Sequence, residues 1–73
     1  MAEFYGKSYR YKDKVIGVCP TLNDEVFMIG HIKQSGSFQR ARIKVFPLFS
    51  SVTEAQMKLD EFACTQGLME VQA

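Results

Sequence analysis

The hydrophobic pattern of the chain changes its period at Pro47, and this change constrains the fold more than any other feature. Before Pro47, short extended segments of apolar and polar residues are separated by turn-forming residues, which is typical of β-strands. After Pro47, apolar residues recur every three or four positions, as on one face of a helix. This order predicts an α+β fold, in which a small antiparallel meander of three to four strands packs against one C-terminal helix.

The helix is expected over about residues 51–66. Ser51-Val52-Thr53-Glu54 matches a capping box, in which the Ser and Glu side chains bond to backbone N–H groups of the first turn. Gly67 can take the left-handed conformation that ends a helix, with Leu68 folding back toward Ala63. The stripe expected to face the sheet consists of Val52, Ala55, Leu59, Phe62 and Ala63.

The sheet is expected over about residues 8–46, and residues 68–71 are a candidate for a short additional edge strand. The extended segments are 9–12, 14–19, 25–33 and 38–46, of which the first two either form a tight hairpin or continue as one bent strand. The turns between them are short, which favours an antiparallel meander. A chain of 73 residues has room for one domain, so residues 1–73 are interpreted as a single domain.

The last extended segment, Phe38 to Phe46, alternates basic and apolar residues. Successive side chains of a strand point to opposite faces. Three apolar residues are therefore expected in the core: Ala41, Ile43 and Val45. Three basic residues are expected to form a ladder on the outer face: Arg40, Arg42 and Lys44.

The first extended segment repeats this spacing with a second row of cations: Arg10, Lys12 and Lys14. If the two segments are neighbours, their cations share one face. Like charges directly opposite each other cost about 0.2–1 kcal/mol per pair, so such a face would indicate an anionic ligand. If the segments are not neighbours, or if Asp13 and Glu25 lie between the cations, the residues form an ordinary solvated face. The sequence leaves both alternatives open.

In the central segment, Val26, Met28 and Ile32 are expected to face the helix. Phe27 and Ile29 are then expected on the outer face, beside the ladder. Aromatic residues and arginines are enriched in protein interfaces, so this face is a candidate docking surface. On the helix, a second candidate interface is formed by Met57 and Cys64, which lie seven residues apart and away from the core stripe.

The chain carries little that supports catalysis. It has one histidine, His31, and two cysteines, Cys19 and Cys64, without the paired spacing of zinc modules. The carboxylates of Asp60 and Glu61 are sequence neighbours, which do not face each other on a helix. We therefore expect no enzyme, no catalytic residue, no metal and no cofactor, and we interpret the cysteines as reduced thiols.

Nine Lys and Arg against eight Asp and Glu give a formal net charge of +1, which argues against a strong overall attraction to nucleic acid or membrane. The charges are unevenly distributed, with +4 over residues 1–46 and −3 over residues 47–73. The sequence shows no secretory signal and no run of membrane-spanning length. A cytoplasmic protein without a membrane partner is expected.

Two functions fit these observations. The first is a non-enzymatic protein-interaction module, such as an adaptor, inhibitor or subunit, which uses the outer sheet face and binds a partner protein or a second copy of itself. The alternative is a nucleic-acid-binding sheet domain. The order of the elements and the ladder look like the small sheet-plus-helix domains with which integrases lay a sheet in the major groove. No small-molecule substrate is indicated. The candidate binding residues are Arg10, Lys12, Lys14, Phe27, Ile29, Phe38, Arg40, Arg42 and Lys44.

Overall fold

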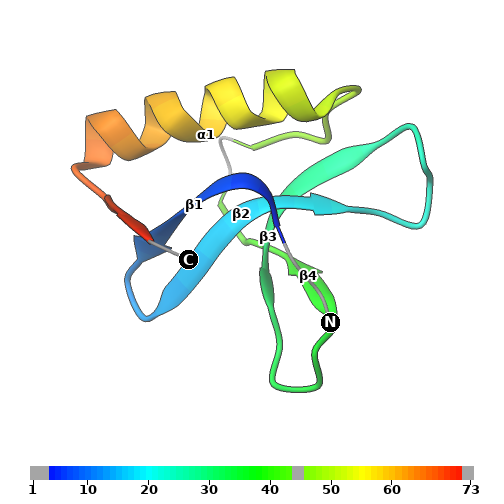
Figure 1. The fold of residues 1–73 in the computed structure, drawn as a ribbon, viewed down its shortest axis with the longest axis horizontal. Helices are drawn as coiled ribbons and strands as arrows, with labels where there is room; N and C mark the ends of the chain where they lie inside the picture. Colours follow the sequence, from blue (N-terminus) through cyan, green and yellow to red (C-terminus); the bar gives the residue numbers. More distant parts are fainter. Residues whose placement is uncertain (1–3, 44–45, 72–73) are drawn as a thin grey trace.

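The computed structural model describes residues 4–43 and 46–71, which form a five-stranded antiparallel sheet and one helix (Figure 1). The elements are β1 (Tyr5–Tyr11), β2 (Lys14–Pro20), β3 (Phe27–Ile32), β4 (Phe38–Arg40), α1 (Val52–Gln66) and β5 (Met69–Val71). The order across the sheet is β4-β3-β2-β1-β5. The predicted α+β class with an antiparallel sheet and a C-terminal helix is confirmed. The sheet has five strands instead of three to four, because the candidate edge strand at residues 68–71 forms as β5, next to β1.

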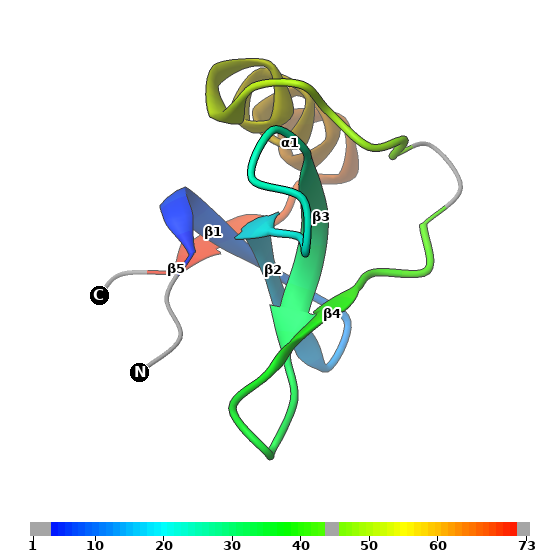
Figure 2. The same ribbon diagram turned by 90° about the vertical axis from the view of Figure 1, so that its right-hand side faces the viewer.

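The helix lies across one face of the sheet, which we call the helix face (Figures 1 and 2). Within the described residues, no helix covers the opposite face, which we call the open face. The core between α1 and the sheet includes buried side chains from three strands, the helix and the segment before it: Tyr9, Ile16, Val18, Ile29, Ala41, Phe46, Phe49, Ala55, Leu59 and Ala63. Burial of each large side chain contributes about 1.5–3 kcal/mol, so this layer accounts for much of the stability of the fold.

Local signals set both ends of α1. The Ser51 hydroxyl accepts a 3.0 Å hydrogen bond from the backbone N–H of Glu54, as the capping box predicts. At the other end Gly67 has φ 68°, and the N–H of Leu68 donates to the carbonyl oxygen of Ala63 at 2.9 Å. This left-handed cap turns the chain back, so that β5 pairs with β1.

The first two strands form a tight hairpin. Tyr11 pairs with Lys14, which leaves Lys12 and Asp13 as the turn. Lys12 has φ 56°, a left-handed conformation that a non-glycine residue adopts infrequently. The turn places the side chains of Lys12, Asp13 and Lys14 together at one end of the sheet.

The strand expected over residues 38–46 ends at Arg40. The prediction that the basic ladder lies on one continuous strand is therefore wrong. Ala41 still donates to the carbonyl oxygen of Ile29 at 3.0 Å, after which the chain leaves the sheet. Further along β3, Phe49 pairs with Phe27 instead, and the two residues exchange two backbone hydrogen bonds of 2.8 Å. Ala41 is buried and Ile43 packs against the core, as predicted. Lys44 and Val45 lie outside the described residues.

The prediction for the two faces of β3 was also wrong. Ile29 pairs with Val18 on the helix face and is 1% exposed, and Phe27 packs against the same core. Met28 and Ile32, expected beneath the helix, lie on the open face instead. The error has a physical reason: β3 is apolar on both sides, so its sequence does not show which set faces the helix.

Candidate functional site

The strand order separates the two predicted rows of cations. Arg10 in β1 and Arg40 in β4 have β2 and β3 between them. Arg10 pairs with Val15 on the open face. Lys14 pairs with Tyr11, whose ring packs on α1, and therefore lies on the helix face. The arrangement in which six cations share one face is therefore wrong.

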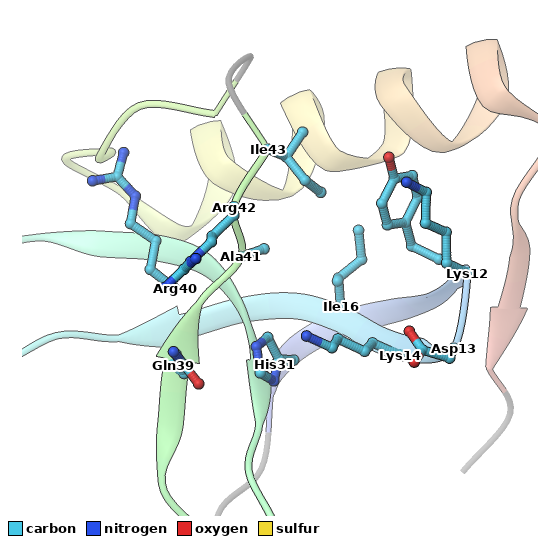
Figure 3. A pocket seen from close by; sticks show the side chains of 11 residues that line it. Lys12, Asp13, Lys14, Ile16, His31, Gln39, Arg40, Ala41, Arg42 and Ile43 are labelled. Atoms are coloured by element: carbon cyan, nitrogen blue, oxygen red, sulfur yellow. The ribbon is translucent and has the colours of Figure 1, made fainter.

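Four of the six cations nevertheless surround one hollow of about 380 Å³, which we call the basic hollow (Figure 3). These four are Lys12, Lys14, Arg40 and Arg42. The hollow lies between the β1–β2 turn and the segment 39–43. Its apolar lining consists of Tyr11, Ile16, Ala41 and Ile43, and its remaining polar lining consists of Asp13, His31 and Gln39.

The basic hollow concentrates positive charge. With His31 neutral, four cations against the carboxylate of Asp13 give it a formal charge of +3, whereas the whole chain carries +1. In the part of the chain that the structure describes, one ion pair is formed, between Lys7 and Glu70 at 4.0 Å. The cations of the hollow therefore have no carboxylate partner among these residues.

The four cations are held differently. Arg40 points away from the centre of the hollow and donates to the carbonyl oxygen of Phe46 at 2.9 Å (Figure 3). The ammonium of Lys12 lies 5.4 Å from the centroid of the Tyr11 ring. Lys14 extends toward His31 (Figure 3). Lys12 and Lys14 keep ammonium hydrogens with which to bind an anion.

The open face is the second candidate site. Strand alternation places Val15, Cys19, Met28, Ile32 and Phe38 on it. Cys19 is fully buried, whereas the other four are partly exposed. In a sheet with one solvated face, outward positions are usually polar. Here the outward side chains of β2 and β3 are as apolar as many inward ones.

Aromatic rings cover the middle of the open face. Gly17 and Gly30 pair across β2 and β3. A Cβ atom on Gly17 would lie 2.6 Å from the ring of Phe4, so the missing side chain is what lets this ring lie on the sheet. The centroids of the Phe4 and Phe38 rings are 6.1 Å apart, a typical distance for a packed aromatic pair.

Charged residues are sparse on the open face. Strand pairing places Arg10 and Arg40 there, toward opposite edges, and the guanidinium of Arg40 is bonded to Phe46. The described strands contribute no acidic residue to this face. Its centre is therefore apolar and uncharged.

The other predicted site residues lie elsewhere. Phe27 and Ile29 face the helix, so neither belongs to the open face. Met57 and Cys64 are exposed on α1, away from the sheet, and Met57 is 66% exposed. They line neither the basic hollow nor the open face.

Several residues of the two sites were not among the binding residues predicted from the sequence. On the open face these are Phe4, Val15, Met28 and Ile32, and in the basic hollow they include Tyr11, Asp13 and His31. One sequence signal could have found Val15. The run from Val15 to Cys19 has no polar side chain, which is typical of a strand covered on both faces.

The two titratable groups with the most altered pKa values, Tyr9 and Cys19, do not line the basic hollow. The hydroxyl of Tyr9 donates to Asp60 in the core layer, and this bond, with burial of the ring, raises the pKa of Tyr9 to about 12. Burial raises the pKa of the Cys19 thiol to about 12. Over residues 4–43 and 46–71, no three His, Cys, Asp or Glu side chains are grouped to hold a metal ion. The described helix is too short and too polar to cross a membrane.

Comparison with known proteins finds no matching family model, no matching curated protein and no matching solved structure.

Proposed function

We propose that the protein is a non-enzymatic interaction module whose docking surface is the open face of the sheet, and that it binds a second copy of itself there. The observation that carries the proposal is the apolar character of a sheet face that no described helix covers. A sheet must bury its apolar face against another layer. The proposed partner supplies this second layer.

The composition of the open face supports a protein partner. The buried centres of interfaces are poor in charge and rich in aromatic residues and Met. Phe4, Phe38 and Met28 provide these residue types here, and Ile32 is 37% exposed beside them. Their packing on the sheet fixes their positions before binding, which lowers the entropy cost of association.

Charge distribution supports self-association. In a symmetric dimer each patch contacts its own copy, so the centre of the patch must be free of like charges. The two cations of the open face, Arg10 and Arg40, lie toward opposite edges of the sheet. Two copies can therefore place their apolar centres together while the arginines remain near the rim. Sheets packed in this way lie about 10 Å apart.

The nucleic-acid alternative has weaker support. Strand order separates Arg10 from the cations that follow β4, so the described residues offer no continuous basic track along the sheet. The basic hollow has the size of a small-ligand site, with a volume of 380 Å³. These observations favour a local anion site over a duplex-binding surface.

Sedimentation equilibrium from about 10 μM to about 1 mM tests the proposal, because weak dimers have dissociation constants in this range. We expect the average mass to rise with concentration from one chain toward two. Ile32→Lys places a charge in the interface and should keep the protein monomeric. The matched control Met57→Lys places the same charge on α1 and should dimerise like the wild type.

Two results would contradict self-association: a single-chain mass for the wild type at every concentration, or equal dimerisation of the wild type and Ile32→Lys. Circular dichroism and thermal melting of both variants verify that each is folded. Ile32 is 37% exposed in the described structure, so a lysine there can be accommodated in the monomer.

A further inference from the structure

We infer that the basic hollow is a binding site for a phosphate monoester of about mononucleotide size, with the phosphate at the cations and the organic group on the apolar floor. The hollow shares Arg40 with the rim of the open face, but its Lys14, His31 and Gln39 lie on the helix face, so its occupancy does not depend on self-association. The inference rests on three features of the hollow: its excess charge, its apolar floor and its volume.

The charge of the hollow is not a consequence of the overall composition. Its four cations and Asp13 give +3, so the rest of the chain carries a formal charge of −2. Gathering like charges around one hollow costs free energy, because the cations repel one another. A dianionic ligand would remove this cost and gain charge-assisted hydrogen bonds at the same place.

The donors surround the hollow from different elements. Lys12 comes from the β1–β2 turn, Lys14 begins β2, and Arg42 follows β4 (Figure 3). Lys14 extends toward His31 of β3. The three peripheral oxygens of a phosphate monoester can accept hydrogen bonds from several directions at once, whereas a carboxylate offers two oxygens in one plane. Donors from three separate elements therefore favour a phosphate.

Asp13 is the one carboxylate in the lining, and its negative charge repels an anionic ligand. It belongs to the same two-residue turn as Lys12. No ion pair between Asp13 and a described cation is formed within 4.0 Å. Even without Arg40, the three cations Lys12, Lys14 and Arg42 outnumber its negative charge, so the hollow keeps a net attraction for a dianion.

The floor of the hollow defines the rest of the ligand. Ile16 and Ala41 form its base but are almost fully buried. Tyr11 and Ile43 are partly exposed and supply the apolar surface that a ligand can cover. An inorganic phosphate would leave this apolar surface wet, whereas a planar or apolar organic group would cover it. The volume of 380 Å³ is within the range of about 300–1,000 Å³ that is typical of small-ligand sites.

Binding of adenosine 5′-monophosphate, measured by calorimetry and by amide NMR shifts, tests the inference. We expect saturable binding at low salt, with shifts gathered at Lys14, His31 and Ala41. Adenosine and inorganic phosphate should each bind at least about tenfold more weakly, because each lacks one half of the contacts. The full chain is used throughout.

Matched charge variants distinguish binding in the hollow from non-specific electrostatic attraction to the protein. Lys14→Gln and Arg42→Gln should each weaken binding about tenfold, as expected for the loss of a charge-assisted hydrogen bond. Arg10→Gln removes the same charge on the open face and should leave binding unchanged. All three side chains are exposed, so the variants should fold, and their melting curves verify this.

Four results would overturn the inference. The first is no saturable binding of the nucleotide at millimolar concentration. The second is an affinity for inorganic phosphate equal to that for the nucleotide, which would show that the apolar floor does not contribute to binding. The third is equal weakening by Arg10→Gln and Lys14→Gln. The fourth is tight binding of a single-stranded oligonucleotide that depends on Arg10 as much as on Lys14, which would indicate a long polyanion instead of a small phosphate ester.

Discussion

The hydroxyl of Tyr9 donates a 2.6 Å hydrogen bond to the carboxylate of Asp60, which joins β1 to α1 across 51 positions of the chain. The ring of Tyr9 is 9% exposed and belongs to the core cluster. Asp60 also accepts a 2.8 Å bond from the side-chain amide of Gln56, one turn earlier on the helix. This network fixes the helix over β1 and β2, and so leaves the opposite face of the sheet open.

Replacing Tyr9 with Phe removes the hydrogen bond and keeps the packed ring. We expect Tyr9→Phe to lower the free energy of unfolding by about 1–2 kcal/mol, because the lost bond has a charged acceptor that is partly exposed. Urea denaturation of the two proteins measures this difference. An unchanged midpoint with an unchanged slope would mean that the bond does not stabilise the fold.

The same residue predicts a pH dependence at high pH. The hydrogen bond to Asp60, followed by burial, raises the pKa of Tyr9 from 10.0 to about 12 in the folded protein. Its contribution is therefore fully present below pH 10 and is lost as the pH rises from 10 to 12. The difference in unfolding free energy between the wild type and Tyr9→Phe should shrink over this interval. A difference that stays constant would contradict the raised pKa.

The two cysteines should differ in reactivity. Cys19 is fully buried on the open face, and its thiol pKa is raised to about 12, so the reactive thiolate is both covered and scarce. Cys64 is exposed on α1. A thiol reagent should therefore modify one cysteine rapidly in the native protein and both after denaturation, and Cys64→Ser should abolish the rapid reaction. Equal rates for both thiols would show that Cys19 is accessible.

The glycine pair in the middle of the sheet predicts an order of stabilities. A Cβ atom at Gly30 would lie 2.4 Å from the backbone carbonyl oxygen of Gln39, so Gly30→Ala must displace β4. We expect a loss of about 1–3 kcal/mol, as for other overpacked sites. At Gly17 the obstacle is the side chain of Phe4, which can turn away, so Gly17→Ala should cost less. Thermal melting of the two variants measures which one is less stable. A Gly17→Ala variant less stable than Gly30→Ala would contradict the packing of these two glycines.

The sequence predicted the helix better than the sheet, and the reason is local. The Ser51 cap and the left-handed Gly67 act within one turn of the chain, so neighbouring residues are sufficient to specify them. The stripe of Ala55, Leu59 and Ala63 has a helical period that no strand would share. These signals do not depend on what the helix packs against.

The faces of β3 and the end of β4 depend on distant contacts. Met28 and Ile29 are both apolar, and pairing with β2 decides which of them meets the helix. The alternation after Arg40 predicts a continuing strand, but Phe49 occupies the position along β3 that this strand would need. Tertiary pairing therefore outweighed a clear local pattern.

The same distinction between local signals and distant contacts applies to the candidate sites. The sequence identified the cations of the basic hollow, including Lys14 and Arg42, but it placed them in two parallel rows. Strand order instead gathers them around one hollow and leaves Arg10 on the open face. Strand order is a property of the whole sheet, and no single segment specifies it.

The most direct test of the proposed self-association is an isotope-filtered NOE experiment on a mixture of labelled and unlabelled chains. We predict intermolecular contacts from the side chains of Val15, Met28 and Ile32 on the open face, and none from Met57 on α1. Intermolecular contacts that come from Met57 instead, or a complete lack of them at a concentration of about 1 mM, would contradict the proposal that two copies meet through the open face.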